Sequence, residues 1–583
     1  MRASRAGSLT TRTTIGALAV AVACCAARLL GLAPSDQPPL VTLSIVGTSD
    51  LHGAAFARSD LGGLPLLAGY INNLREARAS DGGAVLLVDS GDTFQGEVES
   101  NLSEGALVVD AYNAIGYTAQ AIGNHDFDFG SIDSPAARQL PGDLRGALKA
   151  RAAQAHHPFL AANLLDAATG RVVEWRNIQR WRLVDAAGIK VGIVGVMTRD
   201  ALRSTLAANV QGLQVAPLAP AIAAEAATLR RAGARVVVVA AHAGGRCTRF
   251  DDPSDLSSCE ESEIFQVANS LPHGLVDVIA AGHTHAGLAH LVNGIGIVQP
   301  LSRGQAFSRA DVVFDRRTGA VARVQVFAPR PVCAQQDATT GECAAAGVPA
   351  RYEGRTVTPD PAIVRAMAPA LQRVHDLQAA SLGVTLDAPV RRATEVGSPL
   401  GRLFAGALRE ALPGADVAVV NNAGRGLRAD LPDGPLTLGR LYDVFPFDNR
   451  IARIAISGGE LSRWLAMEIG EGRLSGLGVS GVTVRTSCVA GSVHVDLVRG
   501  TGRPVRADEQ LVAAKIGAPT LSGGLAAPDF LGGVGPIDNA PIAREAFEDW
   551  FRRLGRLAQR QRDEKIHESA GLEPAQPADC VAR

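Results

Sequence analysis

Between Val41 and about Val326, short apolar runs rich in β-branched residues alternate with helical stretches. Continuous apolar strands that alternate with helices are typical of α/β layers around a sheet that is buried on both faces. This pattern predicts an α/β fold for the first half of the chain. The expected strands are Val41–Val46, Ala84–Val88, Phe159–Ala162, Val191–Val196, Val236–Ala240 and Leu275–Ala280.

The length of the chain, 583 residues, predicts more than one domain, because single cores seldom grow beyond about 250–300 residues. The pattern changes at Ala328–Gly354, a segment with prolines, two cysteines and a Gly/Thr-rich patch, which indicates a linker. A helical stretch follows from Pro359 to Ala380. We therefore expect a first domain over residues 41–328, a linker and helix over 329–380, a second domain of mixed α and β character over 381–557, and a tail over 558–583.

The N-terminus has the organisation of a secretory signal within residues 1–33. Arg2, Arg5 and Arg12 precede an uncharged stretch from Thr13 to Ala27, which is too short to span a bilayer. The sequence Ala21-Val22-Ala23-Cys24 resembles a lipoprotein signal. Cleavage at Cys24 with a lipid anchor and cleavage nearer Ala33 both stay open. In either case we expect export, to the periplasm or the cell surface.

The net charge and the cysteine spacing argue against two classes of function, nucleic acid binding and metal-thiolate chemistry. The net charge is −1, so the chain has no overall basic field for binding a nucleic acid polymer. Six cysteines follow the signal, and none has C-x-x-C spacing, which argues against a metal-thiolate site. An even number of cysteines in an exported protein indicates disulfides. Proximity in the sequence favours Cys247–Cys259 and Cys333–Cys343, which leaves Cys488–Cys580.

Acids, amides and histidines follow four of these apolar runs and a further short run, Ala121-Ile122. In an open α/β sheet the carboxyl ends of the strands share one crevice, where ligands bind. Nitrogen and oxygen donors without thiolate suit zinc, manganese or iron, and seven donors fit two ions that share a carboxylate. The sequence therefore predicts a site for two divalent metal ions. Its candidate ligands are Asp50, His52, Asp92, Asn124, His242, His283 and His285.

The order of these motifs resembles the calcineurin-like metallophosphoesterases. The motifs are Asp50-x-His52, Gly91-Asp92, Gly123-Asn124-His125-Asp126, His242 and Gly282-His283-x-His285. With its two-domain plan, the chain is similar to the bacterial periplasmic 5′-nucleotidase/UDP-sugar hydrolase family, roughly from Val41 to Leu557. The resemblance implies an N-terminal four-layer sandwich and a C-terminal α+β substrate domain. It also implies that Asp50, His52, Asp92 and His285 hold one metal, and that Asp92, Asn124, His242 and His283 hold the other.

The resemblance gives His125 a role outside the ligand set. His125 follows Asn124 directly and would reach the phosphoryl group, with Asp128 orienting it. A carboxylate partner favours the imidazolium, which can stabilise the transition state or protonate the leaving oxygen. The expected nucleophile is a metal-bound hydroxide, because metal ions lower the pKa of bound water toward about 7.

The second domain carries candidate substrate-binding residues by the same resemblance. Asn422–Arg428 resembles the family's Asn-x-Gly-Gly-Ile-Arg signature with one extra residue, which points to Arg428 as a phosphate ligand. Arg392 is a second candidate. In Val444–Asn449, which resembles the family's Pro-Phe-Gly-Asn motif, Phe447 would stack on a nucleobase and Asn449 would hydrogen-bond to it. The stretch Gly517–Leu525 departs from the family, because it lacks the aromatic residue that forms the other wall of the base site.

These features lead us to expect an exported metal-dependent phosphoesterase. Its substrate would be a small phosphate ester of the nucleotide class, with cyclic phosphodiester or nucleotide-sugar activity also open. Because the second base-stacking residue is not evident, with Phe530 further along the chain an open substitute, a thiosulfate-ester hydrolase of sulfur oxidation with the same architecture is the alternative. A non-enzymatic surface protein that retains the fold is the third hypothesis.

Overall fold

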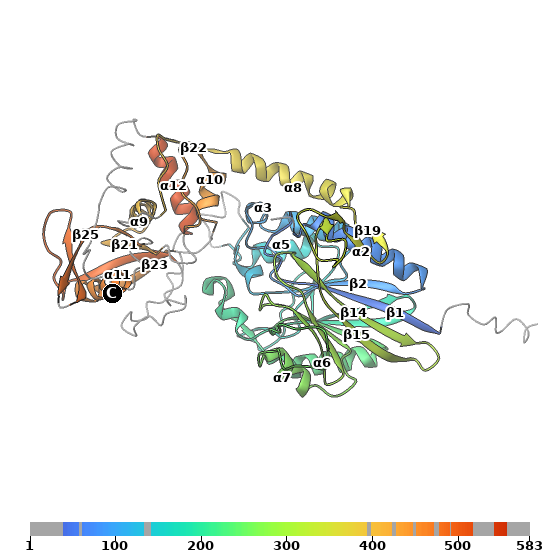
Figure 1. The fold of residues 1–583 in the computed structure, drawn as a ribbon. Coiled ribbons are helices and arrows are strands. Elements are labelled where there is room, and N and C mark those ends of the chain that lie inside the picture. Colours follow the sequence, from blue (N-terminus) through green and yellow to red (C-terminus); the bar gives the residue numbers. More distant parts are fainter. Residues whose placement is uncertain are drawn as a thin grey trace, which may run out of the picture.

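The computed structural model describes residues 39–57, 61–132, 142–392, 398–421, 427–446, 451–470, 477–489, 491–516 and 542–556. Figure 1 shows a larger layered body, a smaller second body and the long helix α8 (Pro361–Ala379) reaching between them. Within the described ranges, no helix combines the length and the apolar character needed to cross a membrane.

Two stacked sheets form the centre of the larger body. The first has the strand order β15-β14-β1-β2-β3-β4-β6, and the second has the order β12-β13-β11-β10-β8-β7. In the first sheet β1, β2, β3, β4 and β6 run parallel, and in the second β8, β10, β11 and β13 do so. The strands are β1 (Leu40–Thr48), β2 (Ala84–Asp89), β3 (Ala119–Ala121), β4 (Phe159–Leu160), β6 (Ile178–Gln179), β7 (Trp181–Ala186), β8 (Ile189–Met197), β10 (Val236–His242), β11 (Val278–Ala281), β12 (Leu288–Val292), β13 (Ile295–Gln299), β14 (Ala306–Asp315) and β15 (Ala320–Pro331).

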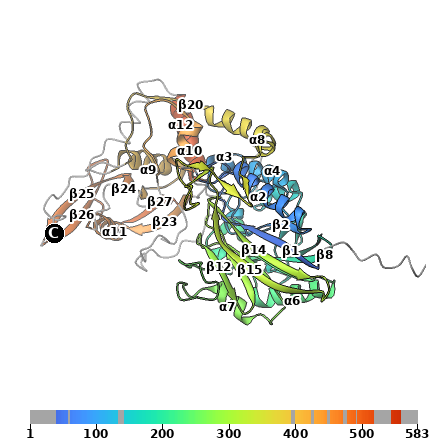
Figure 2. The same cartoon turned by 45° about the vertical axis from the view of Figure 1, so that its right-hand side comes forward.

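Buried apolar residues divide this body into four layers. Leu43 and Ile45 of β1 pack against Val191 and Val238 of the other sheet. Helices α2 (Leu64–Ser80) and α4 (Ala106–Ile115) cover the outer face of the first sheet, and α6 (Leu218–Arg231) and α7 (Glu263–Ser270) cover the second. Figure 2 shows the same arrangement after a turn of 45°. The α/β fold and its four-layer sandwich are therefore confirmed.

Each predicted apolar run forms a strand in the structure. The ends of these strands differ by a few residues from the predicted ends. The strand expected over Leu275–Ala280 begins at Val278, because Leu275 lies in a turn closed by its amide on the Pro272 carbonyl. The helix expected over Pro359–Ala380 is α8. It begins at Pro361, because the Asp360 carboxylate accepts the Ala362 amide at 2.8 Å and caps it.

Helix α8 contributes to the core of the layered body and then reaches the second unit. Ile363, Met367 and Ala370 are buried in the cluster that also holds α2 and α4. The same helix contacts α10 (Leu438–Val444) of the second unit. The linker helix is thus packed against the first domain along part of its length.

The second unit is a mixed α and β structure. Its sheet has the order β23-β27-β21-β24, with β21 parallel to β27 and the other pairs antiparallel. Helices α9 (Pro399–Ala411) and α12 (Ala543–Gly555) share a core in which the rings of Phe404 and Phe547 lie 4.0 Å apart. The α+β prediction is confirmed. The strands are β21 (Val417–Asn421), β23 (Ile451–Ser457), β24 (Leu477–Ser480) and β27 (Gln510–Ile516), next to the hairpin of β25 (Val482–Val489) and β26 (Ser492–Arg499).

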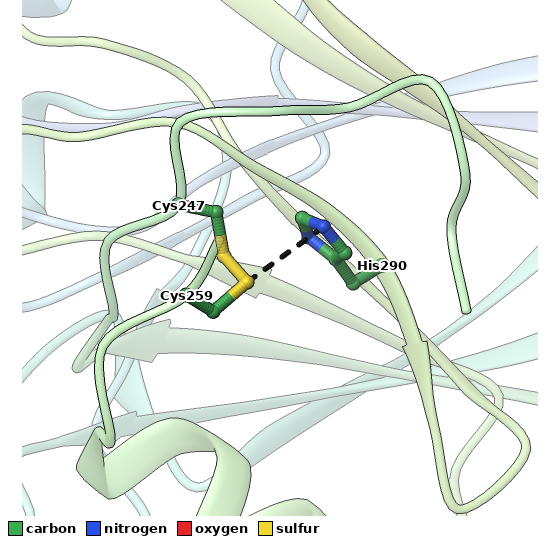
Figure 3. A group of neighbouring side chains, drawn as sticks. All are labelled: Cys247, Cys259 and His290. Carbon is green, nitrogen blue, oxygen red and sulfur yellow. Dashed lines mark hydrogen bonds between the residues drawn. A yellow bond between two sulfur atoms is a disulfide. The ribbon is translucent and has the colours of Figure 1, made fainter. Parts of the chain in front are cut away.

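Both local disulfides that proximity favoured are present, Cys247–Cys259 and Cys333–Cys343. Figure 3 shows the first of them with the imidazole of His290, whose Nε2 lies 3.7 Å from the Cys259 sulfur. Because both sulfur atoms are used in the disulfide, this trio offers no thiolate to a metal. The third predicted pair cannot be followed, since Cys580 lies outside the described residues.

Candidate active site

Six of the seven candidate metal ligands lie on the loops that follow parallel strands, and His242 is the last residue of β10. Five of the seven have a positive φ angle, which non-glycine residues rarely adopt. These five are Asp50, His52, Asp92, His283 and His285. Such backbone strain persists only where surrounding structure enforces it, and it clusters at functional sites. The loops are held together by backbone hydrogen bonds, including Asp50 N to Gly91 O at 2.9 Å and His52 N to Asp92 O at 3.0 Å.

Four of the candidates form one group of converging donor atoms: Asp50, His52, Asp92 and His285. The Nε2 atoms of His52 and His285 lie 3.0 Å apart. His285 Nε2 is 3.4 Å from Asp50 Oδ1, and His52 Nε2 is 4.0 Å from Asp92 Oδ2. The His285 side chain is 42% exposed, whereas Asp50 is fully buried, so this group opens to solvent on the His285 side.

A second group contains Asp92, His242 and His283, with Asn124 beside it. His242 Nε2 lies 3.4 Å from Asp92 Oδ1, 2.9 Å from Asn124 Oδ1 and 3.1 Å from His283 Nδ1. Asp92 thus turns one carboxylate oxygen toward each group, and it is the residue that the two groups share.

The hydrogen bonds around these histidines fit bound cations. His242 Nδ1 is 2.8 Å from the Ser90 carbonyl, and His52 Nδ1 is 2.9 Å from the Gln95 carbonyl. A carbonyl accepts only, so each Nδ1 carries a proton, and each ring presents a lone pair at Nε2 once it is in its neutral form. His242 Nε2 then faces the amide oxygen of Asn124, an arrangement of two acceptors that a cation between them would satisfy. The donor set therefore fits two transition-metal ions.

Charge in this site is balanced by the histidines. Burial alone would raise the pKa of Asp92, but His242, His125 and His52 hold it well below the usual range. Burial lowers the pKa of His242, yet the neighbouring Asp92 carboxylate outweighs this effect and raises it to about 9. Because a metal-ligating imidazole must be neutral, cation binding at His242 would release a proton.

His125 stands beside the first group, with its ring centroid 5.3 Å from that of His52. Its Nδ1 lies 2.5 Å from Asp128 Oδ2, and Thr205 Oγ1 donates to the other Asp128 oxygen at 2.7 Å. Burial lowers the pKa of His125, but Asp128 and Asp92 outweigh this effect and raise it to about 10. The pair predicted from the sequence is thus in direct contact through His125 Nδ1.

Comparison with known proteins matches both parts of this architecture. The family model described as 5′-nucleotidase, C-terminal domain, matches residues 378–509. The chain is 25% identical over 541 residues to protein UshA of Yersinia enterocolitica, which covers 88% of this chain and 90% of that protein. Residues 378–509 thus match the C-terminal domain of 5′-nucleotidases, and the similarity to UshA extends over most of the chain. The chain is also 25% identical over 494 residues to endonuclease YhcR of Bacillus subtilis, but it spans only 36% of that longer protein.

Solved structures share the fold over most of the chain. A 5′-nucleotidase precursor from Thermus thermophilus superposes with a TM-score of 0.52 at 21% identity, covering 88% of this chain and 97% of that one. The sulfate thiohydrolase SoxB from Thermus thermophilus superposes with a TM-score of 0.51 at 18% identity, covering 89% and 95%. Proteins named as a 5′-nucleotidase and as a sulfate thiohydrolase therefore share this fold.

In the second domain, two of the four predicted substrate residues are described and lie together. Arg392 Nη1 donates to the carbonyls of Leu427 and Arg428, at 3.3 and 3.1 Å. The Arg428 amide in turn donates to the Val444 carbonyl at 2.8 Å. Phe447 and Asn449, the other two, lie outside the described residues, as do Gly517–Leu525.

Asp89, at the end of β2, is a support residue that was not predicted from the sequence. Its carboxylate accepts from Thr48 Oγ1 at 2.7 Å, Tyr112 Oη at 2.9 Å, the Gly91 amide at 2.9 Å and Thr93 Oγ1 at 3.0 Å. These bonds hold the turn on which Asp92 sits. An acid directly after an apolar run was the signal that could have revealed it.

Proposed function

We propose that the chain is an exported metal-dependent phosphoesterase that hydrolyses the phosphate esters of nucleotides. The observation that carries this proposal is the convergence of seven nitrogen and oxygen donors into two groups that share Asp92. Asp50, His52, Asp92 and His285 would hold one ion, and Asp92, Asn124, His242 and His283 the other. When bound, the ions supply Lewis acidity at the phosphate and activate the attacking water.

The protein's own contribution to the reaction lies in His125 and its support. Asp128 fixes the ring through Nδ1 and favours its protonated form, so that Nε2 can donate to a phosphoryl or leaving oxygen. Thr205 holds Asp128 in turn. A positioned acid and an electrostatic stabiliser are what phosphate-ester cleavage needs besides the metals.

The nucleotide preference rests on the second domain. Arg392 and Arg428 place two cationic residues on neighbouring segments of the chain, and the segment after Val444 continues toward Phe447 and Asn449. We propose that the arginines recognise phosphate groups and that Phe447 and Asn449 recognise the base. The two disulfides and the signal-like N-terminus support export; a lipid anchor at Cys24 is one of two modes.

A thiosulfate-ester hydrolase is the second candidate. The observation that favours it is the lack of an aromatic residue in Gly517–Leu525, which leaves one wall of the base site unaccounted for. Both candidates use the same metal groups, so only the substrate separates them.

A metal analysis joined to a hydrolysis assay tests the proposal. Purified protein is loaded with zinc, manganese or iron and assayed with a nucleoside monophosphate, a cyclic nucleotide, a nucleotide sugar, p-nitrophenyl phosphate and a thiosulfate ester. We expect metal-dependent phosphate release from nucleotides in the wild type and its loss in Asp92→Asn. Asp200→Asn, at a side chain that is 71% exposed, is the control for loss of a carboxylate. Sulfate release without nucleotide cleavage would refute the phosphoesterase assignment in favour of the second candidate.

A further inference from the structure

One short loop encloses the metal-ligand candidate His52. The Gln95 carbonyl accepts the His52 Nδ1 proton at 2.9 Å, and the Glu97 amide donates to the His52 carbonyl at 3.0 Å. Between them, Gly96 packs so closely that a Cβ atom there would lie 2.4 Å from the His52 carbonyl oxygen. The position of His52 therefore depends on the position of this loop.

Asn101, in the helix α3 (Val98–Leu102) that follows the loop, fixes it from the other side. The Gly96 amide donates to Asn101 Oδ1 at 2.9 Å. The Nδ2 of the same side chain donates to the carbonyl of Pro446, a residue of the second unit, at 3.1 Å in a buried contact. A single side chain thus joins the loop around His52 to a segment 345 residues further along the chain.

Apolar contacts accompany this hydrogen bond. Val98 and Leu102, at the two ends of α3, pack against the hydrophobic core of the second unit. Helix α3 also contacts α10, the helix that leads to Pro446. Helix α3 is therefore the place where the second unit rests on the rim of the metal site.

Pro446 directly precedes Phe447, and the nearby Val444 carbonyl accepts the Arg428 amide. The contact at Asn101 consequently connects the metal side of the site to the segment that carries the proposed substrate residues. We infer that Asn101 is a positioning residue, which aligns an ester held by the second unit with the metal groups of the first. This inference rests on the proposed function.

Asn101 would act by aligning the ester, which the second unit holds, with the metal groups, which the first domain holds. Correct placement of reacting groups contributes a large part of catalysis, and a displacement of about 1 Å can cost roughly 10²-fold in rate. A small ester held only by the metal side does not depend on this alignment. Loss of the Asn101–Pro446 bond should therefore act selectively on nucleotides.

Asn101→Asp is the sharpest test. The aspartate keeps an oxygen to accept from the Gly96 amide but cannot donate to the Pro446 carbonyl, nor to the Gly96 carbonyl, which accepts from Asn101 Nδ2 at 3.4 Å. Asn113→Asp is the matched control, since Asn113 also accepts a backbone amide, from His156 at 2.7 Å, and donates to a backbone carbonyl, of Gln154 at 3.1 Å, within the first domain. We expect kcat/KM for a nucleoside monophosphate to fall roughly tenfold in Asn101→Asp, the scale of one buried hydrogen bond. Hydrolysis of p-nitrophenyl phosphate should stay within about twofold.

A second variant and a metal analysis complete the test of the positioning role. Leu102→Ala weakens the same contact without introducing a charge, and we expect the same selective loss. Elemental analysis should find wild-type metal content in Asn101→Asp. Equal losses on both esters, no loss on either, or the same loss in Asn113→Asp would overturn the positioning role. Wild-type protein that cleaves p-nitrophenyl phosphate but no nucleotide would overturn the proposed function together with it.

Discussion

The contact of Thr205, Asp128 and His125 predicts a graded series of catalytic losses. His125 Nδ1 and Asp128 Oδ2 are 2.5 Å apart, and Thr205 Oγ1 is 2.7 Å from Asp128 Oδ1. A hydrogen bond to a charged group contributes about 1.5–3 kcal/mol. If this contribution is expressed in the transition state, Asp128→Asn should lower kcat roughly ten- to 150-fold, because 1.36 kcal/mol corresponds to tenfold.

The losses expected for His125→Ala and Thr205→Val lie above and below the loss expected for Asp128→Asn. His125→Ala removes the acid itself and should cost roughly 10²–10⁴-fold in kcat. Thr205→Val removes one hydrogen bond from the support, and it should cost at most about tenfold. The assay is steady-state hydrolysis of a nucleoside monophosphate at saturating metal, with metal content measured by elemental analysis for each variant. All three should bind wild-type amounts of metal, since none replaces a proposed ligand.

Two results would refute this reasoning. Metal loss in His125→Ala would make His125 a ligand. Wild-type kcat in Asp128→Asn would mean that the carboxylate serves the fold of the loop alone.

Three further predictions concern the metals, the substrate and the pH dependence of stability. Asp92→Asn should reduce the content of both ions, whereas His52→Ala should affect mainly one; full occupancy in Asp92→Asn would contradict the shared position. Phe447→Ala should weaken nucleotide turnover by about 1–3 kcal/mol, the value of base stacking, and spare p-nitrophenyl phosphate; equal losses would indicate core packing. Burial lowers the pKa of His157 from 6.5 to about 4. As the pH falls from about 6.5 to about 4, the unfolded chain therefore binds a proton at His157 while the folded chain does not, and the free energy of unfolding decreases. His157→Phe should remove about 3 kcal/mol of that pH dependence in chemical unfolding, and an unchanged slope would show that His157 is protonated when folded.

The sequence determined the layered fold to a large extent, and it indicated which candidate metal ligands lie close together. Apolar β-branched runs mark strands because their periodicity is a local property. The carboxyl ends of parallel strands share one edge of a sheet. Polar residues at these ends, such as Asp50 and His242, could therefore be predicted to lie close together from the sequence alone. The local disulfides followed in the same way from short separations in the chain.

Only the tertiary structure decided how these residues work together. The orientation of Asp92 toward both groups and the protonation of His242 depend on atoms from distant strands, including the Ser90 carbonyl. No periodicity or spacing encodes such contacts, because they arise only when the chain path brings separate segments together. The hydrogen bond from Asn101 to Pro446 shows this most clearly. Nothing in the local sequence of the five-residue helix α3 marks Asn101, and the packing of one domain on the other brings it into contact with Pro446.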